Sequence, residues 1–412
     1  QASMLIYPLA KLRQLAKDNV IRPPEKILDL PITAIHAVEL VEENATEIAK
    51  EMGDESTEML KSAMTMMHLR YQAMKVEENK SKGLFSFLAQ SPAPSVPPSA
   101  MLVAFGDNNA TNELVYGVAI DSGRKRITVA FRGSTTNQDF LTDASVSMKT
   151  EENIFAYAPN QEKQIKIHSG FYDYLLSPDY NCGLNSKGNK FDEIIGIISP
   201  LLKLHPDYRL YVTGHSLGGA LATLFSFKAA ACHPTPFQMP ITCVSIASPK
   251  VGDDGFRKAF QLLEEAGKLR HLRVANSLDP VTQNPPASTM TTLAAFSPAA
   301  LLYSLARKDG THNEIYYHVG VKLKLFGEED APPSPFKISY SRGDWKQDMF
   351  SISAARYVTH HYCKEYSVRL TKLKAQLEKM YLNDVYAIKD KSGVGRSLHE
   401  RFMEKCSLNT SS

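Results

Sequence analysis

The chain has 412 residues, of which 43% are hydrophobic and 22% charged, a balance typical of a globular protein and not of a disordered one. Its formal net charge of +3 is too small to indicate a nucleic-acid partner bound through phosphate neutralisation. The five cysteines are scattered and lack the C-x-x-C spacing, which argues against both a zinc site and a dense disulfide framework.

The N-terminal part of the chain is predicted to be helical from residue 1 to about residue 80. Leu9, Leu12 and Leu15 share one helical face, and the later stretch is rich in lysine and glutamate with few helix breakers. The segment SPAPSVPP at 91–98 cannot continue a helix, because proline lacks an N–H donor and restricts the residue before it. We therefore expect an all-helical N-terminal extension with a proline-rich linker over residues 1–98.

Strands are predicted to begin after this linker. Residues 114–120 and 126–131 flank the turn sequence Asp-Ser-Gly, which predicts a β-hairpin. Helices and strands then alternate at the spacing of parallel βαβ units. We expect helices at about 191–204, 217–231 and 254–266, and strands at 209–213, 241–247 and 269–276. The sequence thus predicts an α/β fold with a mostly parallel central sheet and helices on both faces.

The chain is predicted to return to helix after residue 339. Leu370, Leu373, Leu377 and Met380 recur at steps of three and four residues, which is typical of a helix that packs one face on a core. A lysine- and arginine-rich tail follows. We place the central domain at 99–370 and a C-terminal helix with a basic tail at 371–412.

A serine flanked by glycines lies where a predicted strand meets a predicted helix. The segment is Gly214-His215-Ser216-Leu217-Gly218, between an apolar strand and a helix of small residues. A serine hydroxyl becomes an effective nucleophile when a sharp turn presents it beside a base, and Gly214 and Gly218 remove side chains that would clash in such a turn. This context makes Ser216 the candidate nucleophile.

Three further segments accompany this turn in a familiar order: FRGS at 131–134, HSGF at 168–171 and SPKVGD at 248–253. Together with the serine turn, they resemble the motifs of the class 3 (fungal-type) lipase family of α/β-hydrolases over about residues 100–370. The resemblance implies an α/β-hydrolase fold and a serine esterase that acts on lipid esters through an acyl-enzyme. It implies neither a cofactor nor a metal.

Attack on an ester creates a negatively charged oxygen, which needs hydrogen-bond donors already aimed at it. We expect the backbone N–H of Leu217 to be one donor. The resemblance implies that the backbone N–H of Ser134 is the second, with the Ser134 hydroxyl as a third. The alternative is that Ser134 is simply a serine that ends a strand.

Asp279 is the candidate acid. It follows the strand predicted at 269–276, as the order Ser, Asp, His of this fold requires, in a segment that resembles the family's acid segment. A carboxylate there can accept a hydrogen bond from a histidine Nδ1–H and fix its tautomer. Asp279 could otherwise begin a turn before Pro280. Asp253 and Asp254 are alternatives that we expect to cap a helix instead.

His312, His318, His360 and His361 all follow Asp279 and compete for the role of base. His318 resembles a structural strand histidine of the family, and His312 lies in a polar loop. His361 fits the family's pattern of a histidine before a helix with a later tyrosine. We expect His361 to be the base, with His360 as the alternative.

Two earlier histidines are expected to support the site. His168 precedes the serine and should be a packed, hydrogen-bonded residue beneath it, and His215 should shape the turn. Neither is expected to act as the base.

The segment 135–143 occupies the position where related lipases carry a lid helix, with Phe140 and Leu141 as its apolar face. Such a lid covers an apolar groove in water and opens at a lipid surface. The family's usual lid aromatic is tryptophan, which Phe140 replaces here. The apolar segment 293–305 could form a second membrane-facing element, although burial in the core would explain it as well.

The sequence thus predicts a triacylglycerol lipase-like esterase that acts at a lipid or membrane surface. A phospholipase or galactolipase would use the same three residues, and a catalytically silent α/β-hydrolase scaffold is the other alternative. No uninterrupted apolar stretch reaches the roughly 18 residues that a membrane span needs. The cysteine usage favours an intracellular compartment, but the first residue is Gln1, so the native N-terminus and the localisation stay open. The oligomeric state is open too.

Overall fold

The computed structural model describes most of the chain. The described residues are 2–51, 59–69, 71–72, 75, 100–108, 114–134, 147–178, 188–232, 237–283, 316–328, 334–340 and 359–389. Several predicted features lie outside them, namely Phe140, Leu141, His312, the apolar segment 293–305 and the proline-rich segment 91–98.

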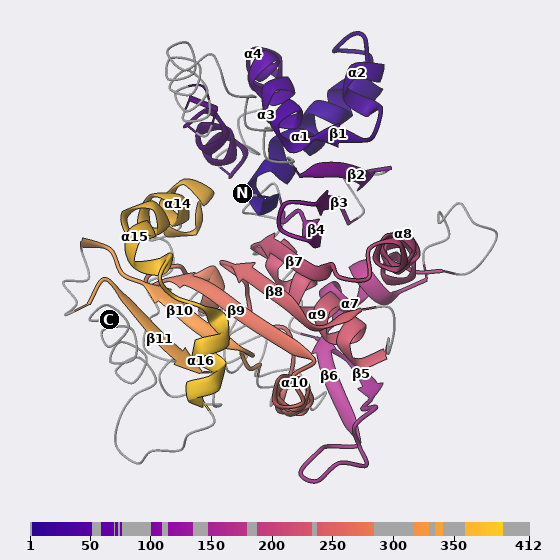
Figure 1. Cartoon of the computed structure of the whole chain (residues 1–412), viewed down its shortest axis with the longest axis vertical. Helices are drawn as coiled ribbons and strands as arrows, with labels where there is room; N and C mark the ends of the chain where they lie inside the picture. The colour runs from indigo at the N-terminus through magenta and orange to yellow at the C-terminus, as the bar shows by residue number, and fades with distance from the viewer. Residues whose placement is uncertain are drawn as a thin grey trace, which may run out of the picture.

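A single large sheet runs through the described part of the molecule (Figure 1). Its strands, in spatial order, are β1 (Ile32–Thr33), β2 (Met101–Gly106), β3 (Tyr116–Asp121), β4 (Arg126–Phe131), β7 (Arg209–His215), β8 (Gln238–Ile246), β9 (Leu269–Asn276), β10 (Val321–Leu325) and β11 (Phe336–Tyr340). The centre, from β4 to β10, is parallel, whereas β1 to β4 and the pair β10–β11 are antiparallel. The predicted hairpin is confirmed as β3 and β4.

Helices cover both faces of this sheet, as predicted. On one face, apolar side chains of β4 and β7 such as Val129 and Val212 share a core with four helices. These are α7 (Ser169–Leu176), α8 (Lys190–Leu204), α9 (Leu217–Cys232) and α10 (Asp254–Glu265). Strand residues whose side chains point to the opposite face, such as Ala130 and Val274, belong to the core on that face. The α/β fold is therefore confirmed, with a parallel centre and antiparallel edges.

The second face is covered by segments from the two ends of the chain (Figure 1). The N-terminal helices are α1 (Ala2–Lys17), α2 (Glu25–Leu28), α3 (Ala34–Glu43) and α4 (Ala45–Lys50), followed by a helix at 59–69. The C-terminal helices are α14 (Cys363–Lys372), α15 (Lys374–Leu377) and α16 (Leu382–Lys389). Helix α1 contacts β4 and β7 directly, so the N-terminal helices share a core with the sheet.

The prediction of an all-helical N-terminal extension is wrong at β1. Ile32 and Thr33 pair antiparallel with Leu102 and Met101 of β2 and extend the sheet by one strand. Two residues carry no strand periodicity of their own; they become a strand because β2 presents an open edge. The predicted domain boundaries near residues 98 and 370 stay predictions.

A second, two-stranded sheet comprises β5 (Met148–Glu152) and β6 (Gln164–His168), and the short 3-10 helix Val281–Gln283 follows β9. The sequence patterns indicated neither this hairpin nor β2, β10 and β11, whose pairing depends on partners elsewhere in the fold. No helix within the described ranges is long and apolar enough to cross a membrane.

Candidate active site

Ser216 lies in the turn between β7 and α9. Its φ of +58° falls in the left-handed region that residues other than glycine rarely adopt. The turn is held by backbone hydrogen bonds: the Ser216 N–H donates to the Ile246 carbonyl at 2.9 Å, and the Gly219 N–H donates to the Ser216 carbonyl at 2.8 Å. Such a strained residue at a strand end is characteristic of functional sites.

The two glycines of the turn leave room for close backbone contacts. A Cβ at Gly214 would lie 2.0 Å from the Gly218 carbonyl oxygen, and a Cβ at Gly218 would lie 2.3 Å from the carbonyl oxygen of Phe131 at the end of β4. Both distances are far below a van der Waals contact, so no larger residue fits either position. The backbone of the serine turn is therefore in close contact with the backbone at the end of β4.

The structure brings Ser216, His361 and Asp279 together. His361 Nε2 lies 2.9 Å from Ser216 Oγ, and His361 Nδ1 lies 3.0 and 3.1 Å from the two carboxylate oxygens of Asp279. Ser216 and His361 are each 3% exposed, and Asp279 is 1% exposed. An imidazole that contacts a hydroxyl at one nitrogen and a carboxylate at the other has the geometry of a general base for that hydroxyl.

Asp279 is held as a buried anion. The Tyr366 hydroxyl donates to its Oδ2 at 2.6 Å, and the Val281 N–H donates to its Oδ1 at 2.9 Å. Burial by itself would raise the pKa of Asp279, but the charge and hydrogen bond of His361, together with the hydrogen bonds from Tyr366 and Val281, hold the pKa below its usual value. The carboxylate can therefore orient the imidazole and stabilise its protonated form.

A second histidine supports the backbone of His361. His215 Nε2 donates to the His361 carbonyl at 2.9 Å, which leaves His215 Nδ1 as an acceptor for the Tyr7 hydroxyl at 3.3 Å. Burial and the nearby His361 lower the pKa of His215 to about 3, so its ring is neutral. This arrangement agrees with the expected supporting role of His215.

The end of β4 contributes backbone next to the serine. A Cβ at Gly133 would lie 3.2 Å from Ser216 Cβ, so the Gly133–Ser134 segment runs alongside the nucleophile. Leu217 begins α9, and the N–H groups of a first helical turn have no partner within the helix and carry its partial positive charge. Of the two residues predicted as oxyanion donors, Leu217 directly follows Ser216, and Ser134 follows Gly133, whose backbone lies beside Ser216.

Three further histidines, His360, His168 and His318, form hydrogen bonds elsewhere. His360 Nδ1 lies 2.7 Å from Arg369 Nη2. His168 accepts from the Gly170 N–H at 3.1 Å and stacks on Phe171. His318 lies 2.7 Å from the carbonyl oxygen of Thr282.

Asp253, an alternative acid in the sequence, caps α10 as predicted. Its side chain accepts from the Phe256 N–H at 2.8 Å. Its carboxylate is therefore engaged in helix capping.

Sequence reasoning missed Tyr7. Its hydroxyl lies 3.1 Å from the Gly133 N–H and thus joins α1 to the segment beside Ser216. The side chain is 1% exposed, and the only local signal was its place on the buried face of a predicted helix. A hydrogen bond between residues more than a hundred positions apart has no periodicity that could reveal it.

Within the described residues, no cluster of three or more His, Cys, Asp or Glu side chains is arranged to hold a metal ion. The strained serine between a central parallel strand and a helix, with an acid and then a histidine following in chain order, defines an α/β-hydrolase fold.

Comparisons with known proteins agree with this class. Residues 128–289 match the family model described as lipase (class 3). This part of the chain is therefore similar to the class 3 lipases.

Among curated relatives, phospholipase A1-II 3 of Oryza sativa subsp. indica is 29% identical over 196 residues, covering 45% of this chain and 46% of that protein. Phospholipase A1-IIgamma of Arabidopsis thaliana is 33% identical over 173 residues, covering 40% of this chain and 39% of that protein. Galactolipase DONGLE, chloroplastic, of Arabidopsis thaliana is 30% identical over 169 residues, covering 40% and 34%. The chain spans less than half the length of these three relatives.

Solved structures of fungal lipases also match. The Rhizomucor miehei triacylglyceride lipase has a TM-score of 0.44 at 18% identity, covering 64% of this chain and 82% of that chain. The lipase from Rhizopus microsporus var. chinensis has a TM-score of 0.40 at 18% identity, covering 60% and 67%.

Proposed function

We propose that this protein is a serine carboxylic ester hydrolase that cleaves acyl esters of glycerolipids. The observation that carries the proposal is the continuous hydrogen-bonded path from Ser216 Oγ through His361 to Asp279, at a strained turn between a parallel strand and a helix. This path has the elements that activate a hydroxyl for attack on an ester carbonyl.

In the proposed reaction, Ser216 Oγ attacks the ester carbonyl while His361 Nε2 takes its proton. Asp279 holds the Nδ1–H of His361 and stabilises the imidazolium that forms. The backbone N–H groups of Leu217 and Ser134 bind the oxyanion of the tetrahedral intermediate. His361 then gives its proton to the leaving alcohol, and an acyl-enzyme on Ser216 remains until a water molecule, activated by the same histidine, releases the fatty acid.

The substrate class rests on the family and on the relatives' names. Relatives called phospholipase A1 and galactolipase favour a polar glycerolipid as much as a triacylglycerol, since both kinds of substrate present an acyl ester to the same three residues. We extend the proposal to action at a lipid surface, where the substrate is concentrated.

The test is hydrolysis by the wild type and by Ser216→Ala. On p-nitrophenyl butyrate, we expect the variant to lose about 10⁴-fold or more in kcat, the scale of loss typical when a triad member is removed. Equal rates would overturn the enzymatic proposal and favour a silent scaffold. Emulsions of triolein and vesicles of phosphatidylcholine or monogalactosyldiacylglycerol, compared by fatty acid release, then assign the head group.

A further inference from the structure

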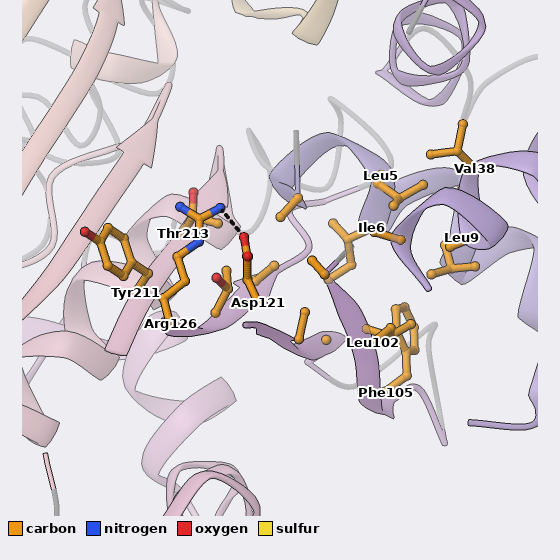
Figure 2. A pocket seen from close by; sticks show the side chains of 18 of the residues that line it. Leu5, Ile6, Leu9, Val38, Leu102, Phe105, Asp121, Arg126, Tyr211 and Thr213 are labelled. Atoms are coloured by element: carbon orange, nitrogen blue, oxygen red, sulfur yellow. Dashed lines mark ion pairs between the residues drawn. The ribbon is translucent and has the colours of Figure 1, made fainter. Parts of the chain in front are cut away.

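A cavity of about 520 Å³ lies between the N-terminal helices and the sheet, away from Ser216. Its walls are formed by α1, α3 and one face of β2, β3, β4 and β7 (Figure 2). In the parallel pair β4–β7, Arg126 is level with Arg209, whereas Phe131 is level with Gly214 beside the nucleophile. The cavity therefore extends to the amino ends of these strands, while Ser216 follows the carboxyl end of β7.

The cavity exists because the cover on this face is incomplete. Gly117, Ala119 and Ala130 line its floor with small side chains. Thr128 of β4 and Tyr211 of β7 are only half-buried, although strands in the parallel centre of a sheet are normally buried on both faces. The space beneath α1 and α3 is thus accessible, and its volume falls in the range that single small ligands fill.

The two ends of the cavity differ in chemistry. Near the helices the lining is apolar and includes Leu5, Ile6, Leu9, Leu102 and Phe105 (Figure 2). The residues that line this end offer contacts for a hydrocarbon chain, and none of them carries a charged side chain. Moving an apolar chain from water into this end would be favourable, with a free energy roughly proportional to the apolar area that is buried.

The opposite end carries a surplus of positive charge. Asp121 pairs with Arg124 at 3.0 Å and with Arg126 at 3.4 Å, which leaves two cationic groups against one carboxylate. The Arg126 guanidinium lies over the Tyr211 ring, 5.3 Å from its centroid. Arg126 Nε is buried and has no hydrogen-bond partner among the described residues. A buried donor without a partner is costly and indicates a missing acceptor.

We propose that this cavity is a binding site for a single-chain amphiphile with a carboxylate head, a medium- or long-chain fatty acid. The hydrocarbon tail lies against α1 and β2, and the carboxylate accepts a hydrogen bond from Arg126 Nε beside Arg124. A carboxylate neutralises the surplus charge and supplies the acceptor that Arg126 Nε lacks. Binding at this site does not depend on hydrolysis at Ser216.

The test is isothermal titration calorimetry with dodecanoate below its micelle-forming concentration, compared with dodecanol. To keep the proposed function out of the measurement, all variants are made in the Ser216→Ala chain. We expect dodecanoate to bind at least about tenfold more tightly than dodecanol, because a hydrogen bond to a charged group contributes about this factor. Equal binding of the two ligands, or no binding of dodecanoate, would overturn the proposal.

Two variants and one matched control locate the site. Arg126→Gln should weaken dodecanoate binding at least about tenfold and leave dodecanol binding unchanged. Ala119→Leu fills the floor of the cavity and should weaken the binding of both ligands. Lys125→Gln removes the same charge from the neighbouring position, whose ammonium pairs with Asp207 at 2.8 Å and does not line the cavity, and should bind like the parent.

Thermal unfolding without ligand checks that each variant is folded. If one variant does not fold, the other still decides the question, because they act on different ends of the cavity. Unchanged dodecanoate affinity in a folded Arg126→Gln or Ala119→Leu variant would overturn the proposal and place any binding elsewhere, for example beside Ser216.

Discussion

The hydroxyl of Tyr7 lies 3.1 Å from the backbone nitrogen of Gly133 and accepts its hydrogen bond. The same hydroxyl lies 3.3 Å from His215 Nδ1, so one side chain of α1 contacts both the end of β4 and the serine turn. Gly133 precedes Ser134, whose N–H is a proposed oxyanion donor. The N-terminal helix therefore supports the position of a backbone segment that the proposed chemistry uses.

Replacing Tyr7 with Phe should lower kcat about tenfold with KM nearly unchanged. The variant leaves the buried Gly133 N–H without its acceptor, a loss of about 1–2 kcal/mol, and loosens a donor that acts on the transition state. Steady-state kinetics on p-nitrophenyl butyrate measures the effect. Tyr157→Phe, at a side chain that is 84% exposed, is the matched control and should behave like the wild type. A rise in KM with constant kcat would contradict the positioning role.

The neighbouring histidines 360 and 361 should differ sharply on substitution. His361→Ala removes the proposed base and should lower kcat about 10⁴-fold or more. His360→Ala removes a ring that contacts Arg369 and should change kcat only a few-fold. The two variants, assayed side by side on the same ester, serve as each other's control, and similar losses in both would refute the assignment of the base.

Asp279→Asn should keep the fold and lose activity. The amide is nearly the same size as the carboxylate, but it cannot hold the Nδ1–H tautomer of His361 or stabilise the imidazolium, which costs about 10⁴-fold in kcat in comparable sites. Kinetics at pH 8, together with circular dichroism to verify folding, tests this. Activity within tenfold of the wild type would mean that Asp279 does not orient the base.

Gly133→Ala should damage the site, whereas Gly196→Ala should not. A Cβ at Gly133 would lie 2.3 Å from the Tyr7 hydroxyl and 2.5 Å from the His215 carbonyl oxygen, so the β4 end must move. At Gly196, within α8, a Cβ would meet nothing within 4 Å, and alanine should stabilise the helix by up to about 1 kcal/mol. Urea unfolding and ester hydrolysis measure both changes; a fully active Gly133→Ala variant would contradict the close contact.

Stability should fall as the pH drops below about 6.5, because several histidines are buried in neutral form. Burial lowers the pKa of His168 to about 4 and that of His271 to about 3, and it lowers the pKa of His318 well below its usual value. With folded pKa values below the unfolded value of about 6.5, the unfolded chain takes up protons first. The stabilisation is complete above about pH 6.5 and is lost as the pH falls towards the folded values.

Urea unfolding between pH 8 and pH 5 checks this. The free energy of unfolding should be nearly constant from pH 8 to 7 and then fall by up to about 1.4 kcal/mol per pH unit for each such histidine. In His271→Gln, the free energy of unfolding should fall less steeply below pH 6.5, because one buried histidine no longer contributes to the fall. A free energy that stays constant down to pH 5 would contradict the prediction.

Features that depend on neighbours along the chain could be predicted from the sequence. The hairpin β3–β4, the central strands β7, β8 and β9 and the helices between them follow from local periodicity and turn residues. The need for glycine at 214 is also local, because a Cβ there would meet backbone atoms of Gly218 and Gly219, whereas the need for glycine at 218 comes from the end of β4.

Contacts between residues far apart in the chain depend on the folded arrangement and could not be predicted in this way. His360 and His361 are adjacent in the chain, yet backbone direction at the start of α14 brings one ring to Ser216, 145 positions away, and the other to Arg369. The strand β1 and the contact of Tyr7 with Gly133 likewise depend on how α1 and β2 pack on the sheet. Contacts of this kind are fixed by packing of the whole core, and a one-dimensional pattern does not encode them.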